Sequence, residues 1–154
     1  MKKWIVALAA LGILWALHPF QGMDAGNLCV VETLLVEPMQ GEIYVASGAL
    51  NGTGATVSEA LQDMAEHTPG PLFLRQVRRI ILCDNEADIQ PLMGLPDEIP
   101  MGTLIYTSSE TAESLQAQDT LDQVLEAREQ RDRTMPSLAM AKNHWLEEHR
   151  NTVE

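Results

Sequence analysis

The sequence predicts a small α+β domain, in which a mixed sheet of about four strands packs against helices and the C-terminal part is helical. Three observations lead to this prediction. Aliphatic and β-branched runs of strand length occupy residues 28–36, 42–47 and 77–83. An amphipathic helical pattern at 57–65 separates the second run from the third, and after residue 109 the apolar residues recur at helical spacing.

The first two strands are expected to form an antiparallel hairpin. Residues 28–36 are a continuous apolar run that ends before a turn sequence at 37–41, which contains proline and glycine. Residues 42–47 follow closely enough to pair with that run. The next stretch, 48–55, contains three glycines and is predicted to be a flexible loop.

The helix after this loop has the clearest pattern in the chain. Thr56 is placed to cap its N-terminus, while Glu59 reaches back in a capping-box arrangement. One buried face is predicted, formed by Val57, Ala60, Leu61, Met64 and Ala65. The two prolines and the glycine within residues 68–71 end the helix.

The remaining elements follow in order along the chain. Residues 77–83 read as a central strand that completes a strand-helix-strand crossover, and residues 101–107 as a fourth strand. A short helix beginning at Asp84 or Asn85 would be strained by Pro91. Three C-terminal helices are expected at 109–116, 119–131 and 136–149.

The N-terminus predicts export. Lys2 and Lys3 precede a fourteen-residue apolar run, 4–17, so residues 1–23 read as a signal peptide or a membrane anchor and residues 24–154 as a single extracytoplasmic domain. The length of the run matches a signal-peptide core. No small-x-small cleavage site follows it, and cleavage and retention both stay open. The expected location is the outer side of a cell or spore membrane, or the exterior after cleavage.

The charge of the chain argues against nucleic acid as a partner. The sequence has 22 acidic and ten basic residues. No acidic residue and two of the basic ones lie within 1–23, so residues 24–154 carry 22 acidic and eight basic residues, a net charge of −14. Such a charge repels nucleic acid and anionic lipid. Solubility of an exposed surface explains it more simply than an acidic binding face.

Two motifs in the sequence are candidate ligand sites, a glycine loop and a pair of histidines. Gly52, Thr53 and Gly54 stand between a strand and a helix, where backbone N–H groups bind phosphate, and they form a candidate ligand or partner loop. The third glycine and the Gly-Lys-Ser/Thr of nucleotide loops are missing, which favours a plain turn. His144 and His149 are five residues apart and fall on different helix faces, so ordinary surface residues are the stronger interpretation over a metal site.

The two cysteines and the arginine cluster can each be interpreted in two ways. Cys29 and Cys83 would form a disulfide if their strands were neighbours, but two separate buried thiols are favoured. Arg75, Arg78 and Arg79 form a basic cluster, for which pairing with nearby acids outweighs an anion or partner site. No catalytic residue, metal ligand or cofactor site is predicted, and we expect a protein that is not an enzyme.

Three segments resemble, in order and spacing, the amino-terminal domain of the Ger(x)C family, the C-subunit lipoproteins of bacterial spore germinant receptors. Residues 53–61 (TGATVSEAL) are similar to the helix start of that domain, and residues 72–82 (LFLRQVRRIIL) to a segment that leads into an aliphatic strand. Residues 102–115 (GTLIYTSSETAESL) are similar to its fourth strand and following helix. Gln76 stands where the family often has histidine.

This resemblance implies a function in spore germination. It suggests a non-enzymatic, membrane-associated component that acts in receptor assembly or signalling, with integral membrane subunits of the receptor as partners. The alternative is an exported soluble module, unrelated to germination, that binds a small ligand or a protein.

Overall fold

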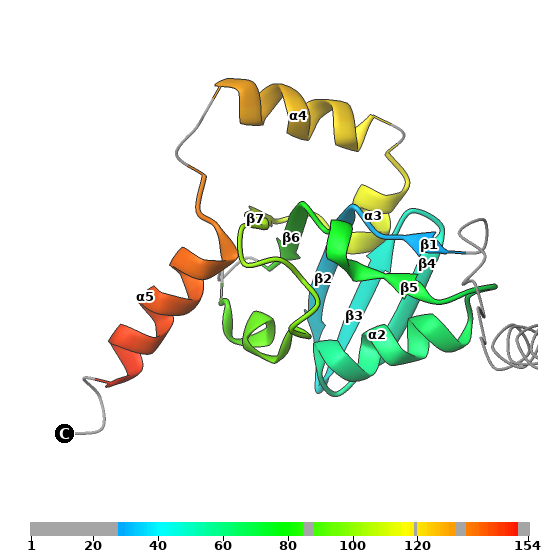
Figure 1. The fold of residues 1–154 in the computed structure, drawn as a ribbon, viewed down its shortest axis with the longest axis horizontal. Helices are drawn as coiled ribbons and strands as arrows, with labels where there is room; N and C mark the ends of the chain where they lie inside the picture. The colour runs from blue at the N-terminus through cyan, green and yellow to red at the C-terminus, as the bar shows by residue number, and fades with distance from the viewer. Residues whose placement is uncertain (1–27, 85–87, 119, 132–134, 151–154) are drawn as a thin grey trace, which may run out of the picture.

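The structure is a computed structural model that describes residues 28–84, 88–118, 120–131 and 135–150. Figure 1 shows the whole arrangement. The predicted signal peptide or anchor at 1–23 lies outside the described residues. Among the described helices, none is long and apolar enough to cross a membrane.

A five-stranded mixed sheet forms the centre of the domain, which confirms the α+β class with one strand more than the four expected. The strand order is β4-β3-β2-β6-β7. Strand β2 pairs antiparallel with β3 and parallel with β6, which in turn pairs parallel with β7. The strands are β2 (Thr33–Met39), β3 (Glu42–Ser47), β4 (Leu50–Gly54), β6 (Arg79–Cys83) and β7 (Leu104–Ser108).

The predicted hairpin is present between β2 and β3. Its turn contains Gly41 at a φ of 85°, a backbone conformation that glycine adopts without steric cost. Strand β2 runs on through Met39, further than predicted. It pairs with β6 only as far as Val36, so Pro38 removes no hydrogen bond from that pairing.

The prediction of one continuous strand over 28–36 is wrong. Strand β1 (Cys29–Val30) pairs parallel with β5 (Leu72–Phe73) in a separate two-stranded sheet. The chain bends at Glu32, whose carbonyl oxygen accepts hydrogen bonds from the backbone N–H groups of Arg78 and Arg79 at 2.9 and 3.2 Å. The apolar run is therefore shared between two sheets, which its composition does not reveal.

The predicted loop at 48–55 is also wrong, since residues 50–54 form the edge strand β4. This strand lies against helix α2 (Val57–Glu66). A Cβ atom on Gly52 would lie 2.3 Å from the carbonyl oxygen of Ala60, and one on Gly54 would lie 2.5 Å from the Ala60 nitrogen. The two glycines therefore allow a helix and a strand to approach more closely than any side chain would permit.

The N-terminus of α2 forms as the sequence predicts. The Thr56 side chain accepts a hydrogen bond from the backbone N–H of Glu59 at 3.2 Å. The Glu59 carboxylate accepts one in return from the N–H of Ala55 at 3.0 Å, one residue before the cap. Both bonds satisfy backbone donors at the start of the helix region.

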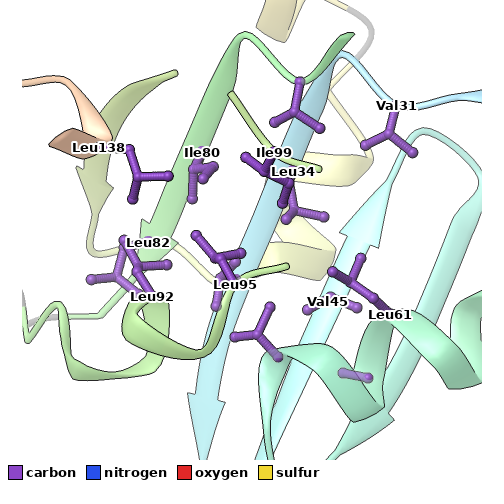
Figure 2. Close-up of a cluster of buried hydrophobic side chains, with 14 of the residues drawn as sticks. Val31, Leu34, Val45, Leu61, Ile80, Leu82, Leu92, Leu95, Ile99 and Leu138 are labelled. Carbon is purple, nitrogen blue, oxygen red and sulfur yellow. The ribbon is translucent and has the colours of Figure 1, made fainter. Parts of the chain in front are cut away.

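One face of the sheet carries the larger apolar core. Figure 2 shows Val45 of the sheet beside Leu61 of α2, and Leu82 beside Leu92, and the same cluster contains Leu34 and Ile80. The 3₁₀ helix η3 (Gln90–Gly94) closes the same side. The start of the short helix predicted from Asp84 or Asn85 falls at 85–87, outside the described residues, and its later part is a 3₁₀ turn with Pro91 in its first turn, where a proline removes no helical hydrogen bond.

The opposite face is covered by α3 (Ala112–Gln116) and α4 (Leu121–Arg131), and Figure 1 shows α2 and α4 on opposite sides of the sheet. Helix α5 (Leu138–Arg150) extends away from the sheet. Its first residue is buried, and Ser137 forms an antiparallel bridge with Leu104 beside β7. The three C-terminal helices are those expected, each starting two or three residues later than predicted.

Candidate functional site

Arg79 is the centre of a polar network between the sheet and helix α4. It lies in β6 and is only 8% exposed. Its guanidinium donates to both carboxylate oxygens of Glu129 in α4, from Nε at 2.5 Å and from the second terminal nitrogen at 3.3 Å. The other terminal nitrogen lies 3.4 Å from Asp122. This two-pronged contact is the geometry in which arginine binds carboxylates most strongly.

Two hydroxyl groups complete the network. Tyr106 in β7 donates to Glu129 at 2.8 Å, and Thr33 in β2 donates to Asp122 at 2.9 Å. Three strands of the sheet therefore hold one helix through two carboxylates. Among the described residues, every buried side-chain nitrogen and oxygen atom has a hydrogen-bond partner.

The network fixes the protonation of its members at neutral pH. The hydrogen bonds from Arg79 lower the pKa of Glu129, and the same contact raises the pKa of Arg79. Burial, together with the bond to Glu129, raises the pKa of Tyr106 to about 12. A general acid or base works best with a pKa near the working pH, and none of these three groups has one there. The arrangement suits the attachment of a helix better than proton transfer.

Beside this network lies a surface hollow of about 560 Å³, here called the arginine hollow. Arg75, Gln76 and Arg78 line it, with Thr103 and Glu129 among the residues opposite. The predicted pairing of the arginine cluster with acids therefore holds for Arg79. Among the described residues, Arg75 and Arg78 form no ion pair within 4 Å, although the charge of Arg78 helps to lower the pKa of Glu129.

A second hollow, of about 430 Å³, lies between α2 and the segment that leads from β5 into the 3₁₀ helix η2 (Leu74–Gln76). We call it the apolar hollow, since Leu61, Leu72 and Phe73 line it. Arg75 lines both hollows, so the two are neighbours.

The candidate ligand loop at Gly52, Thr53 and Gly54 is occupied by contacts within the domain. The N–H group of Thr53 donates to the Asp63 carboxylate at 2.9 Å, and the N–H group of Ala55 donates to Glu59. Helix α2 fills the space above the two glycines. The donors that would hold a phosphate are thus engaged by side chains of α2.

The two cysteines are free thiols in separate sheets. Cys29 belongs to β1 of the two-stranded sheet, and Cys83 ends β6 of the five-stranded one. Cys83 is buried, and this burial raises its pKa to about 12, so its thiol stays protonated and unreactive at neutral pH. The structure therefore has two separate thiols, as the favoured interpretation predicts. Cys29 is half-buried and not fully buried.

The two histidines of α5 lie apart, as their spacing indicated. His144 faces Glu148 at 3.4 Å, whereas the ring of His149 stacks on Trp145 with centroids 3.9 Å apart. Within the described part of the chain, no group of three or more His, Cys, Asp or Glu side chains is placed to hold a metal ion.

Sequence reasoning missed Glu129 and Tyr106 as partners of Arg79. The basic cluster was visible, but nothing local in the sequence links it to a glutamate fifty residues away. A buried arginine in an otherwise aliphatic strand was the available signal, because such a charge needs a partner from another element.

Comparison with known protein families, with curated proteins and with solved structures finds no match to this chain.

Proposed function

We propose that this protein is a non-enzymatic spore germination protein, a membrane-associated component that resembles a germinant-receptor C-subunit and acts in receptor assembly or signalling. Its partners in this proposal are the integral membrane subunits of the receptor. The N-terminal apolar segment at 1–23 would hold it at the outer side of the membrane.

One observation carries the proposal furthest. The three segments that resemble the Ger(x)C domain are far apart in the chain, yet apolar residues from all of them meet in a single buried cluster. Leu61 comes from the first segment, Ile80 from the second and Ile105 from the third. A likeness whose apolar residues meet in one core is what a shared fold would produce, because core positions restrict residue choice most strongly.

The polar network supports a binding role over a catalytic one. Arg79, Glu129 and Tyr106 satisfy one another and attach α4 to the sheet. Among the described residues, Arg75 and Arg78 form no ion pair, and their exposed side chains line an open hollow. A surface of this kind serves recognition of another molecule.

The test is fractionation of spores and vegetative cells of the native host, followed by detection of the chain and its apparent mass. The proposal predicts uncleaved protein in the spore membrane, and genes for the two membrane subunits beside its own. A Leu11→Arg variant should be released from the membrane, since a charge inside the apolar run costs about 2.5–3.5 kcal/mol on insertion. The matched Leu11→Ile variant should stay in the membrane.

A shortened and freely soluble product from an isolated gene would contradict this proposal. That outcome would favour the alternative of an exported soluble module that binds a small ligand or a protein. The open apolar hollow beside α2 is the feature of the structure that speaks for this alternative.

A further inference from the structure

Three hydrogen-bond donors meet at the arginine hollow without partners of their own. The side chains of Arg75, Gln76 and Arg78 are exposed and line the same hollow. Toward the other residues that the structure describes, these three side chains form no hydrogen bond and no ion pair within 4 Å. A guanidinium group is a strong donor to carboxylates, and two of them are available here.

The backbone beneath these donors is held rigidly. Val77 donates its N–H to Leu74 and accepts a hydrogen bond from the buried Thr103 hydroxyl at 2.8 Å. Arg78 donates its N–H to Glu32 at 2.9 Å and accepts from the N–H of Leu104 at 2.8 Å. The loop is fixed on both sides, so a ligand would not have to order it on binding.

Charge favours an acidic ligand at this place. The chain has a net charge of −12, and Arg75, Arg78 and Arg79 stand together within it. The carboxylate of Glu129 also lines the hollow, but it is paired with Arg79 and accepts a bond from Tyr106. The guanidinium groups of Arg75 and Arg78 therefore remain exposed and without an ion pair among the described residues, on a chain of net negative charge that repels long polyanions, and they can bind a short acidic segment.

The neighbouring apolar hollow would accept an apolar group of the same ligand. Arg75 lines both hollows, and the lining of this one includes Leu61, Leu72 and Phe73 as well as Glu98. A ligand that reaches across Arg75 would place an apolar group against α2 and an acidic group against Arg78. An extended peptide carries side chains of both kinds a few ångströms apart.

We propose that the two hollows together form a docking site for an extended segment of a partner protein, in which carboxylate side chains bind Arg75 and Arg78 and a neighbouring apolar side chain enters the apolar hollow. The site is built from the rigid turn before β6 and from the exposed side of α2. This inference concerns the chemistry of the contact and holds whether or not the partner is a receptor subunit.

The test uses the full chain and a set of short peptides that alternate glutamate with leucine, valine or phenylalanine. Binding is followed by NMR signals of the arginine side chains and of the backbone at 74–79. We expect the Arg75→Gln/Arg78→Gln double variant to bind these peptides about tenfold more weakly, as loss of charge-assisted hydrogen bonds predicts. Arg150→Gln, at the exposed end of α5, is the matched control and should bind as the wild type does.

One further variant and one further set of peptides test the two halves of the site separately. Gln62→Trp places a large ring in the apolar hollow from an exposed position on α2, and it should weaken peptide binding without unfolding the domain. Peptides with glutamine in place of glutamate should fail to bind. All variants are checked for an unchanged unfolding midpoint.

Four results would overturn the proposal. The first is an absence of binding by every glutamate peptide, and the second is equal binding by the double variant. The third is an equal response of the arginine signals to inorganic phosphate alone, which would make this a small-anion site. The fourth is equal capture of the protein by vesicles of anionic phospholipid, which would make it a membrane contact.

Discussion

The two faces of the sheet are held in different ways. On the α2 face, Leu34, Ile80 and Leu82 are fully buried, and two glycines bring a helix into direct contact with a strand. On the α4 face, a smaller apolar cluster is joined by the Arg79–Glu129–Tyr106 network. The first face is held mainly by close apolar packing, whereas the second depends also on an ion pair between the sheet and a helix. The first should therefore decide whether the domain folds, and the second whether α4 stays attached.

Substitution at Gly52 should have the largest effect. In Gly52→Ala the new methyl group would meet the backbone of Ala60 and Met64 at 2.3 and 2.5 Å, so α2 would have to move off β4. We expect a loss of about 3 kcal/mol or more in the free energy of unfolding, measured in urea. Gly94→Ala is the control, since its methyl group would meet no atom within 4 Å, and it should change the free energy by less than about 0.5 kcal/mol. Equal effects of the two variants would contradict the close packing of α2.

Removal of the Glu129 charge should have the next largest effect. Glu129→Gln keeps the shape of the side chain but weakens the bonds from Arg79 and Tyr106, and it should cost about 2 kcal/mol. Glu126→Gln, on the exposed side of the same helix, is the matched control and should change little. If both substitutions lower the free energy of unfolding by the same amount, the network does not stabilise the domain.

Acid should weaken the α4 face selectively. The folded pKa of Glu129 lies below its ordinary value of 4.5, so the unfolded chain takes up this proton first as the pH falls. Stability from this group is complete above about pH 4.5 and is lost as the pH passes through the lowered pKa. A plot of unfolding free energy against pH should fall less steeply in Glu129→Gln than in the wild type. Parallel curves for the two proteins would refute the assignment.

The contact at Asp122 should matter least. Its side chain is 73% exposed and lies 3.4 Å from Arg79, so water and salt screen the pair. We expect Asp122→Asn to change the free energy of unfolding by less than about 0.5 kcal/mol, and the change to vanish in high salt. A loss as large as that of Glu129→Gln would show that α4 is held mainly through its first turn.

The elements predicted correctly are those with a local cause. The β2–β3 hairpin follows from two short apolar runs around a turn at Gln40 and Gly41, and the start of α2 from Thr56 and Glu59. Both rest on residues close in sequence, so they can be read directly from it.

The errors have a nonlocal cause. The run at 28–36 is apolar throughout, but it bends at Glu32 because the backbone of Arg78 and Arg79 binds there. Residues 50–54 have the composition of a loop, yet they form a strand that pairs antiparallel with β3, and its glycines let α2 pack closely against it. In both places a distant part of the chain overrides the local preference.

The candidate site was only half visible in the sequence. The sequence shows the basic cluster and predicts its pairing with acids, which is confirmed for Arg79. The three arginines differ because α4 supplies ion-pair partners to Arg79. Among the described residues it forms no ion pair with Arg75 or Arg78. Helix α4 has a weak apolar face, so its docking position is set by long-range polar contacts that periodicity does not report.

Amide hydrogen exchange in the wild type and in Glu129→Gln at neutral pH tests the contrast between the two faces most directly. If the Arg79–Glu129–Tyr106 network holds only the α4 face, the amides of α4 should exchange faster in the variant while those of α2 and β6 keep their protection. Equal acceleration in all three elements would contradict this account, because the two faces would then unfold as one unit. Unchanged exchange in α4 would contradict it as well, since the network would not be what attaches the helix.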